Sequence, residues 1–348
     1  MNIDSSLIVK KKILIILPTP IAVGDLMMMQ SLFILIKERN PGVMLDVLAA
    51  SKTPELITRM PEIRQIIHSP LTHGKWDLSL RYQLGKSLRA EKYDQAIVFS
   101  TSFKAGLVPW FAKIPLRTGL RRKWSLSLLN ETRLLPRPRL PRMIQRFLSV
   151  YLKPGERIDE ERYLPKIPAN SASLSQALDK FKIIQDEKPI LALCPGSTGG
   201  SSKRWPENYF SQLAEYFSNQ GWSVWCIGGP AEKEIIANIN ANLKEPTVDL
   251  GRTSLTEALD LMSLATVVVA NDSGLMHMAC ALSKPVVAIY GSGSPEYTPP
   301  LTRKAKVFYK GLSCQPCYKS ECPLVHRNCL KQIAVAEVID AVQTLAAV

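Results

Sequence analysis

The sequence predicts an α/β protein of two doubly wound, Rossmann-like domains that face a central cleft. Short apolar runs rich in β-branched residues alternate with amphipathic stretches along the chain, which is the pattern of parallel βαβ units. The length of 348 residues suffices for two such domains. A segment at 153–172 holds three prolines and little apolar periodicity. We therefore place the boundary there, between domains at 1–160 and 161–348.

The elements follow in order, each strand as a short apolar run and each helix as a stretch with apolar residues three or four apart. In the first domain we expect strands at 13–17, 43–48 and 96–99 and helices at 26–38 and 103–111. In the second domain we expect strands at 190–194, 223–227, 267–270 and 286–290. The helices there are expected at 207–219, 231–243, 254–265 and 274–282. A last helix at 333–345 has two alternatives, since it can pack on the second domain or return to the first.

The formal net charge of +14 lies almost entirely in the first half. Residues 1–165 carry 27 Lys and Arg against 14 Asp and Glu, whereas residues 166–348 carry 17 against 16. Ten of the basic residues lie in 113–146, where Glu131 is the one acid. We expect the first domain to meet an anionic partner. No nucleic-acid-binding motif accompanies the charge, so a membrane surface or an acidic substrate is favoured and nucleic acid is not expected. The alternative is a basic face that is only solvated.

The location predicted from the sequence is the cytoplasm. No apolar run approaches the roughly 18 residues that a transmembrane helix needs. The seven cysteines all follow residue 190, and an odd number is not typical of a secreted disulfide framework. Lys10, Lys11 and Lys12 precede an apolar run, but no small-residue cleavage site follows it, so we expect no signal peptide.

Two common signatures of nucleotide sites are missing. The nearest match to G-x-G-x-x-G begins at Gly291 and has Glu296 where its last glycine belongs, which argues against a dinucleotide-dependent oxidoreductase. No two aspartates stand two residues apart, so the sequence lacks an Asp-x-Asp clamp for a metal-bridged sugar nucleotide. A diphosphate leaving group would then need cations and amide dipoles of the protein.

The loop after the strand at 190–194 has such groups. It is rich in small residues and opens a helix, so its free N–H groups form an anion site. Ser197 and Thr198 add hydroxyl donors, and Lys203 adds a positive charge. The alternative is a surface loop that holds a lysine by chance.

A second such junction follows the strand at 267–270. Asp272 and Ser273 stand at the start of a helix, Gly274 allows a ligand to approach closely, and His277 lies one turn further on. The alternatives are an aspartate that caps the helix and a buried histidine that bonds to the backbone.

A third junction places Asp25 after Gly24, at the carboxyl end of the first strand. Ligands of doubly wound proteins bind at this end of the strands, so Asp25 is a candidate catalytic carboxylate. The alternative is again an N-cap, here for the helix at 26–38.

In type, order and spacing, the segments 18–25, 195–206 and 271–277 resemble glycosyltransferase family 9, the bacterial ADP-heptose:lipopolysaccharide heptosyltransferases. The stretches 24–32, 100–119, 128–135 and 290–301 are similar to the heptosyltransferase II branch. The resemblance covers nearly the whole chain. It implies a GT-B fold and an inverting, metal-independent transfer of L-glycero-D-manno-heptose from ADP-heptose to the first heptose of the lipopolysaccharide inner core.

The resemblance also implies roles for single residues. Asp25 is the general base that accepts the proton of the acceptor hydroxyl. The ADP phosphates are held by side chains or amides of Ser197, Thr198, Lys203, Ser273 and Gly274. Asp272 and His277 line the donor site, and Thr253 lies where the adenine binds. Glu234 matches a carboxylate near the nucleotide ribose, or else it is an ordinary exposed helix residue.

The acceptor implied by the resemblance is lipid-linked and carries carboxylates and phosphates. Its expected contacts are Lys104, Arg121, Arg122 and Lys123. The chain would then act as a peripheral protein on the cytoplasmic side of the inner membrane of a Gram-negative bacterium, where basic residues are favoured.

Four cysteines, Cys314, Cys317, Cys322 and Cys329, fall within sixteen residues. Four thiolates at such spacing can bind a structural zinc, although free thiols or a local disulfide are alternatives. No cofactor is expected to be required for catalysis.

Three other functions remain open at this point. The first is a family 9 transferase with another acceptor or sugar, of the heptosyltransferase I or III type. The second is a sugar-nucleotide epimerase, which shares the two-domain architecture. The third is a lipopolysaccharide-binding protein without catalysis.

Overall fold

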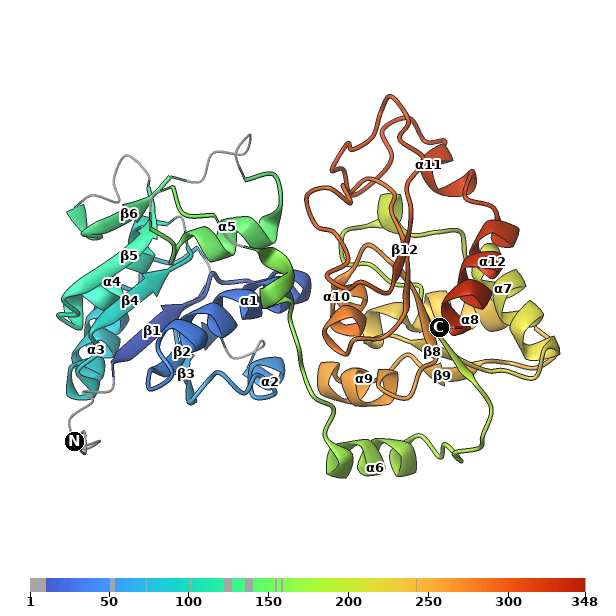
Figure 1. Ribbon diagram of the computed structural model, residues 1–348, viewed down its shortest axis with the longest axis horizontal. Coiled ribbons are helices and arrows are strands. Elements are labelled where there is room, and N and C mark those ends of the chain that lie inside the picture. Colours follow the sequence, from blue (N-terminus) through green and yellow to red (C-terminus); the bar gives the residue numbers. More distant parts are fainter. Residues whose placement is uncertain are drawn as a thin grey trace, which may run out of the picture. The chain divides into compact units, whose positions relative to one another are not determined.

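The computed structural model describes residues 11–50, 54–72, 74–100, 102–121, 127–134, 140–153, 155–157, 159–241 and 243–347. Contacts within the chain divide it into two compact units, Met1–Tyr163 and Leu164–Val348. Each unit is built on one parallel sheet with helices around it (Figure 1). The predicted α/β class with two doubly wound sheets is confirmed.

The described strands of the first unit form a sheet in the order β3-β2-β1-β4-β5-β6. They are β1 (Lys12–Ile16), β2 (Met44–Ala50), β3 (Gln65–Ser69), β4 (Gln95–Val98), β5 (Leu116–Leu120) and β6 (Glu131–Arg133). The direction in which strands are added reverses between β1 and β4. The loops that follow these two strands therefore diverge, and such a point is where doubly wound sheets bind ligands.

The helices of the first unit are α1 (Val23–Arg39), α2 (Pro54–Ile57), α3 (Leu78–Leu88), α4 (Phe103–Phe111) and α5 (Met143–Ser149). Every residue of α1 from Leu26 to Phe33 is buried, including Gln30 and Ser31. A helix that is apolar on all sides belongs to a core, and α1 packs against α5. The first turn of α1, which contains Asp25, is thus fixed by a buried helix.

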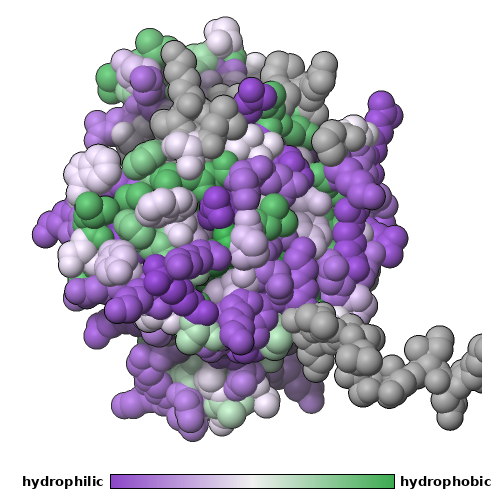
Figure 2. All heavy atoms as spheres, turned by 90° about the vertical axis from the view of Figure 1, so that its left-hand side faces the viewer, coloured by the Kyte–Doolittle hydropathy of each residue, from purple (hydrophilic) through white to green (hydrophobic). Residues whose placement is uncertain are grey.

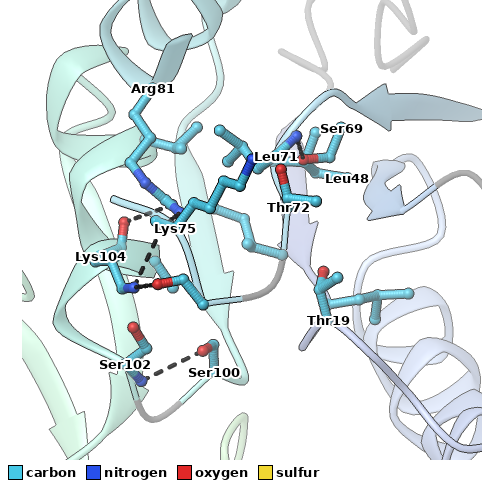
Figure 3. A pocket seen from close by; sticks show the side chains of 15 residues that line it. Thr19, Leu48, Ser69, Leu71, Thr72, Lys75, Arg81, Ser100, Ser102 and Lys104 are labelled. Atoms are coloured by element: carbon cyan, nitrogen blue, oxygen red, sulfur yellow. Dashed lines mark hydrogen bonds between the residues drawn. The ribbon is translucent and has the colours of Figure 1, made fainter. Parts of the chain in front are cut away.

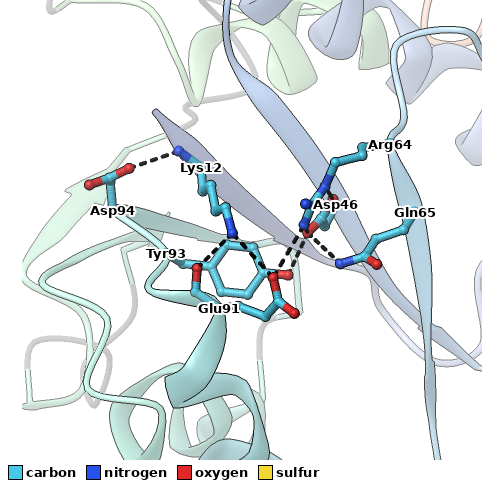
Figure 4. A network of polar contacts seen from close by, with 7 residues as sticks. All are labelled: Lys12, Asp46, Arg64, Gln65, Glu91, Tyr93 and Asp94. Carbon is cyan, nitrogen blue, oxygen red and sulfur yellow. Dashed lines mark hydrogen bonds and ion pairs between the residues drawn. The ribbon is translucent and has the colours of Figure 1, made fainter. Parts of the chain in front are cut away.

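A network of hydrogen bonds and ion pairs lies at the amino ends of β1, β2, β3 and β4 (Figure 4). Asp46 on β2 is fully buried and accepts hydrogen bonds from Arg64 Nε at 2.8 Å, from Gln65 Nε2 at 2.9 Å and from the Tyr93 hydroxyl. Burial alone would raise the pKa of Asp46, but the bonds from Arg64, Tyr93 and Gln65 outweigh it and hold this pKa below its ordinary value. Asp46 is therefore an ionised carboxylate that joins β2, β3 and the turn before β4.

The described strands of the second unit lie in the order β12-β11-β10-β7-β8-β9. They are β7 (Ile190–Cys194), β8 (Ser223–Ile227), β9 (Val248–Leu250), β10 (Val267–Asn271), β11 (Val286–Ile289) and β12 (Ala305–Phe308). The helices are α6 (Ser171–Lys180), α7 (Glu207–Asn219), α8 (Lys233–Asn240), α9 (Leu255–Met262), α10 (Gly274–Ala281), α11 (Asn328–Lys331) and α12 (Val335–Ala346). Here the order reverses between the neighbours β7 and β10.

The last helix, α12, packs on the sheet and on α7 of its own unit. Val338 and Val342 join a core cluster with Leu193 and Val269 from the central strands. The apolar stripe of this helix is therefore used within the second unit.

The predicted elements agree with the structure where a strand or helix is strongly apolar. The predictions 103–111, 190–194, 207–219 and 223–227 match α4, β7, α7 and β8 residue for residue. The expected helix at 231–243 is instead a 3₁₀ turn, Pro230–Glu232, followed by the shorter α8. Not predicted from the sequence were the strands β3, β5, β6, β9 and β12 and the helices α2, α5, α6 and α11. Among the described residues, no helix is long and apolar enough to span a bilayer.

Candidate functional site

The loops that follow β7 and β10 meet because these two strands are neighbours in the sheet. Asn271, the last residue of β10, is fully buried between them. Its Nδ2 donates to the carbonyl of Pro195 at 2.7 Å, and its Oδ1 accepts from the Trp205 backbone N–H at 3.0 Å. One amide thus fixes both ends of the loop that holds Lys203. This role of Asn271 was not predicted from the sequence.

Lys203 and Asp272, predicted separately from the sequence, form one ion pair. The Lys203 Nζ lies 2.6 Å from Asp272 Oδ2, and the Asp272 side chain is only 5% exposed. Gly293 covers the pair, since a Cβ at this position would lie 2.0 Å from Asp272 Oδ2. Asp272 therefore holds the lysine in place, and the alternative of a chance surface lysine is wrong.

The amino end of α10 carries two unused polar atoms. Ser273 is its N-cap, and neither the buried Ser273 Oγ nor the buried His277 Nδ1 has a hydrogen-bond partner among the described residues. The pKa of His277 is lowered to about 4, chiefly by burial; the Asp272 charge opposes this shift and the Lys203 charge adds to it. The imidazole is thus neutral at pH 7. Buried polar atoms normally have partners, so these two at a helix amino end indicate a polar ligand, and the backbone-satisfied alternative for His277 is wrong.

Close contacts require small residues in the loop that follows β7. Ser197 Oγ accepts the Gly199 N–H at 3.2 Å, while Thr198 is exposed. Gly200 has φ +98°, and a Cβ there would lie 2.2 Å from the Ser320 carbonyl oxygen. The loop is therefore a packed turn with hydroxyl groups at its surface, and not a flexible segment.

The predicted Glu234 is exposed on α8, whereas Glu232, two residues earlier, packs against this loop. A Cβ on Gly196 would lie 2.2 Å from Glu232 Cγ, and Glu232 Oε2 accepts the Gly229 N–H at 2.9 Å. The 3₁₀ turn before α8 brings Glu232 inward. The carboxylate beside the loop is thus Glu232, and the pair of glycines before Pro230 was the sequence signal for this turn.

Thr253 is buried, and its hydroxyl donates to the carbonyl of Gly228 at 2.8 Å. This bond ties the segment between β9 and α9 to the loop after β8. The Thr253 side chain therefore has a structural partner, which leaves the neighbouring backbone as the part available to a ligand.

In the first unit, a cavity of about 190 Å³ lies at the carboxyl ends of the central strands (Figure 3). Its lining includes hydroxyl groups of Thr19, Ser69, Thr72, Ser100 and Ser102. Its charged lining residues are Lys75, Arg81 and Lys104, and no Asp or Glu is among the described residues that line it. The cavity is therefore suited to a polar, anionic ligand.

Arg81 and Lys104 are held in this cavity by main-chain oxygens. Arg81 is buried and donates to the carbonyls of Trp76 at 2.7 Å and Lys104 at 2.9 Å. Lys104 Nζ donates to the carbonyls of Gly74 at 2.7 Å and Lys75 at 3.2 Å. Burial lowers the pKa of Arg81, although nearby Asp77 opposes this. These bonds fix two cations without neutralising their charge.

Asp25 occupies the first turn of α1 and is partly exposed. The N-cap of α1 is Ala22, so the alternative that Asp25 caps this helix is wrong. Asp25 is not among the described residues that line the 190 Å³ cavity. Arg121 directly follows β5 and is exposed, and its backbone N–H donates to the carbonyl of Arg133 at 2.8 Å. The predicted acceptor contacts Arg122 and Lys123 lie outside the described residues.

Cys314, Cys317, Cys322 and Cys329 line a single cavity of about 20 Å³ and are all free thiols. In the described part of the chain, no three His, Cys, Asp or Glu side chains are arranged to hold a metal ion. The local-disulfide alternative is not what the structure shows, and the structural zinc stays a prediction.

The same segment is bonded to the loop of Lys203. The Ser202 N–H donates to the Ser320 carbonyl at 3.1 Å, and the Tyr318 N–H donates to Ser292 at 2.9 Å. Gln315 Nε2 donates to the carbonyl of Gly291 at 2.7 Å. The cysteine segment thus supports the loops on either side of the Lys203–Asp272 pair.

Comparison with known proteins gives a consistent result. The profile of glycosyltransferase family 9 (heptosyltransferase) matches residues 81–327. Lipooligosaccharide heptosyltransferase 2 of Haemophilus influenzae is 40% identical over 299 residues, which cover 83% of this chain and 86% of that protein. Lipopolysaccharide heptosyltransferase 2 of Salmonella typhimurium is 38% identical over 306 residues, covering 85% and 87%.

A solved structure agrees with these relatives. The ADP-heptose lipopolysaccharide heptosyltransferase II of Escherichia coli superposes with a TM-score of 0.83 at 33% identity, over 97% of this chain and 98% of that one. The match extends over both units, and the family profile includes both the 195–206 and the 271–277 segments. The chain therefore belongs to glycosyltransferase family 9.

Proposed function

We propose that this chain transfers L-glycero-D-manno-heptose from ADP-heptose to the first heptose of the lipopolysaccharide inner core. The observation that carries the proposal is the pair of unpartnered atoms, Ser273 Oγ and His277 Nδ1, beside the Lys203–Asp272 ion pair. The similarity to heptosyltransferases 2 supports this acceptor over those of the type I and III enzymes.

The second unit binds the donor in this proposal. Lys203 and the amide groups at the start of α10 lie where a diphosphate gains most from positive charge. Ser273 Oγ donates to a phosphate oxygen, and the neutral His277 completes the site without adding charge. As the bond from the sugar to the diphosphate breaks, negative charge grows on the leaving ADP, and these groups stabilise it.

The first unit binds the acceptor. Its cavity offers hydroxyl groups for a sugar and three cations for anionic groups of the inner core. Asp25 accepts the proton of the acceptor hydroxyl while that oxygen bonds to the anomeric carbon of the donor. ADP departs from the opposite side of this carbon, so its configuration inverts.

The acceptor is anchored in a membrane, so we further propose that the protein works at the cytoplasmic face of the inner membrane. The excess of basic residues in the first half supports this location.

The test is transfer from ADP-heptose to acceptors that carry zero, one or two heptoses, read by mass spectrometry. We expect the one-heptose acceptor to gain a single heptose. Transfer to the others would indicate a type I or III enzyme, and turnover of the donor without any acceptor would indicate an epimerase or hydrolase.

The Asp25→Asn variant tests the base in the same assay. We expect turnover to fall about 10²- to 10⁴-fold with unchanged ADP affinity, because the carboxylate acts on the acceptor only. Equal turnover of the variant and the unmodified protein would remove Asp25 from this role.

A further inference from the structure

The outer surface of α3 and α4 exposes large apolar side chains. Trp76, just before α3, is 61% exposed, and Leu78, Tyr82 and Trp110 are 55%, 45% and 48% exposed. We call these four residues, with Phe111 between them, the aromatic face. Figure 2 shows hydrophobic side chains gathered among hydrophilic ones on the side of the first unit where these helices lie. Such a patch on a folded protein indicates an interaction surface.

The packing of the two helices makes this face rigid. Gly85 lets α3 approach α4 closely, since a Cβ there would lie 2.5 Å from Phe111 Cβ. The ring of Phe111 contacts those of Tyr82 and Trp110 edge-on, with centroids 5.3 and 5.1 Å apart. Phe111 therefore holds the exposed rings of Tyr82 and Trp110 in place.

A basic pocket opens at the Trp110 end of the aromatic face. It has a volume of about 410 Å³, and its charged lining residues are Arg89, Lys113 and Arg117. No acidic residue is among the described residues that line it. Arg89 Nε donates to the Phe111 carbonyl at 2.9 Å, and Arg117 Nε donates to the Leu128 carbonyl at 2.7 Å. Main-chain oxygens thus position both guanidinium groups and leave their charge available.

We propose that the aromatic face and the basic pocket together form a docking site for an anionic phospholipid bilayer. The Trp and Tyr rings enter the headgroup region, where amphipathic rings are favoured, and a lipid phosphate enters the basic pocket. The charged residues that line the basic pocket are all positive. This favours a bilayer over a second copy of the chain, since two copies would bring like charges together.

The other end of the aromatic face lies at the rim of the acceptor cavity. Lys104 Nζ lies 5.3 Å from the centroid of the Trp76 ring and also lines that cavity, as does Lys75. An acceptor anchored in the docked bilayer would therefore present its sugar beside this rim. This inference deepens the proposed function, but lipid binding itself does not depend on it.

The test measures co-sedimentation with vesicles of phosphatidylethanolamine with and without phosphatidylglycerol. We expect binding to need the anionic lipid and to weaken as salt is raised. Lys113→Ala should weaken binding about fivefold, and Trp76→Ala with Trp110→Ala should weaken it at least about tenfold. Lys306→Ala and Ile184→Ala remove an exposed lysine and an exposed apolar residue of the second unit, and they should bind like the unmodified protein.

Two further measurements complete the test, namely transfer to the acceptor and the oligomeric state of the protein. Transfer to an acceptor in vesicles should fall in the Trp110→Ala variant, while transfer to the same acceptor without acyl chains should not change, because Trp110 does not line the acceptor cavity. Equal binding to neutral vesicles, or unchanged binding of the Trp and Lys113 variants, would overturn the proposal. So would sedimentation showing a dimer that the Trp variant dissociates, because the face would then join two copies. Failure of all transfer with intact vesicle binding would overturn the proposed function alone.

Discussion

Lys203 Nζ lies 2.6 Å from Asp272 Oδ2, although the two residues follow different strands of the sheet. The carboxylate is nearly buried and therefore depends on this lysine for neutralisation. The lysine remains partly exposed, so its charge is also available to a ligand. One cation thus serves both the stability of the second unit and the proposed phosphate site, and substitutions can separate the two roles.

Lys203→Met should lower the free energy of unfolding by about 3 kcal/mol, because it leaves Asp272 buried and unpaired. Adding Asp272→Asn should restore most of this stability without restoring ADP affinity. Urea unfolding and calorimetry with ADP measure the two effects, and Lys306→Met on β12 is the matched surface control. Recovery of ADP affinity in the double variant would show that Lys203 acts only as a partner for Asp272.

Asn271→Ala should weaken ADP binding although Asn271 is assigned no contact with the nucleotide. The substitution removes two buried hydrogen bonds, to Pro195 and Trp205, at a cost of about 2–3 kcal/mol in stability. The loop of Lys203 then loses the two bonds from Asn271 that hold its ends. Calorimetry at a temperature where the variant is folded checks this, with the surface residue Asn238→Ala on α8 as control. Unchanged ADP affinity in the folded variant would contradict the positioning role.

Asp46→Asn should remove part of the acid sensitivity of the first unit. The pKa of Asp46 is lowered in the folded state, so its contribution to stability is present above its ordinary value of 3.8 and is lost as the pH falls through the folded value. The variant should lose about 3 kcal/mol at pH 7, where Arg64 is left without its partner, and less at pH 3.

Urea unfolding between pH 3 and pH 7 measures the Asp46 effect. Asp186→Asn replaces an exposed aspartate of the second unit and should follow the unmodified protein at each pH. A loss of stability in Asp46→Asn that is the same at every pH would contradict the titration argument.

The zinc predicted from the sequence is tested by purification without chelator, although the side chains of the four clustered cysteines are not arranged to hold a metal ion in the structure. About one zinc ion per chain would confirm the prediction. Cys322→Ser should lose the metal, while Cys226→Ala, which removes a buried thiol of β8, should retain it. Elemental analysis measures the zinc content of each variant. Four freely titratable thiols in metal-free, folded protein would contradict the prediction and favour the free-thiol alternative.

The junction residues could be predicted because parallel strands bring their carboxyl ends together. Lys203, Asp272, Ser273 and His277 were therefore expected at one place, and the structure groups them around β7 and β10. Glu234 is exposed on α8, and the role of Glu232 beside the loop was not predicted because a 3₁₀ turn before α8 brings Glu232 inward. Spacing alone does not reveal such a shift.

Edge strands and surface helices were missed for a different reason. β3 has only partly buried or exposed residues, and β6 and β9 have three residues each, so their apolar signal is weak. The exposed apolar residues of α3 lie outside the core, and its pattern is therefore not that of an ordinary amphipathic helix. These same exposed residues form part of the aromatic face.

The bonds from Ser320, Tyr318 and Gln315 to the loops around Lys203 have a consequence for the order of synthesis. The ribosome makes residues 312–322 long after the loop at 195–203 that they support. A nascent chain therefore contains α3 and α4, the helices of the aromatic face, well before it contains the residues that support the loops around Lys203.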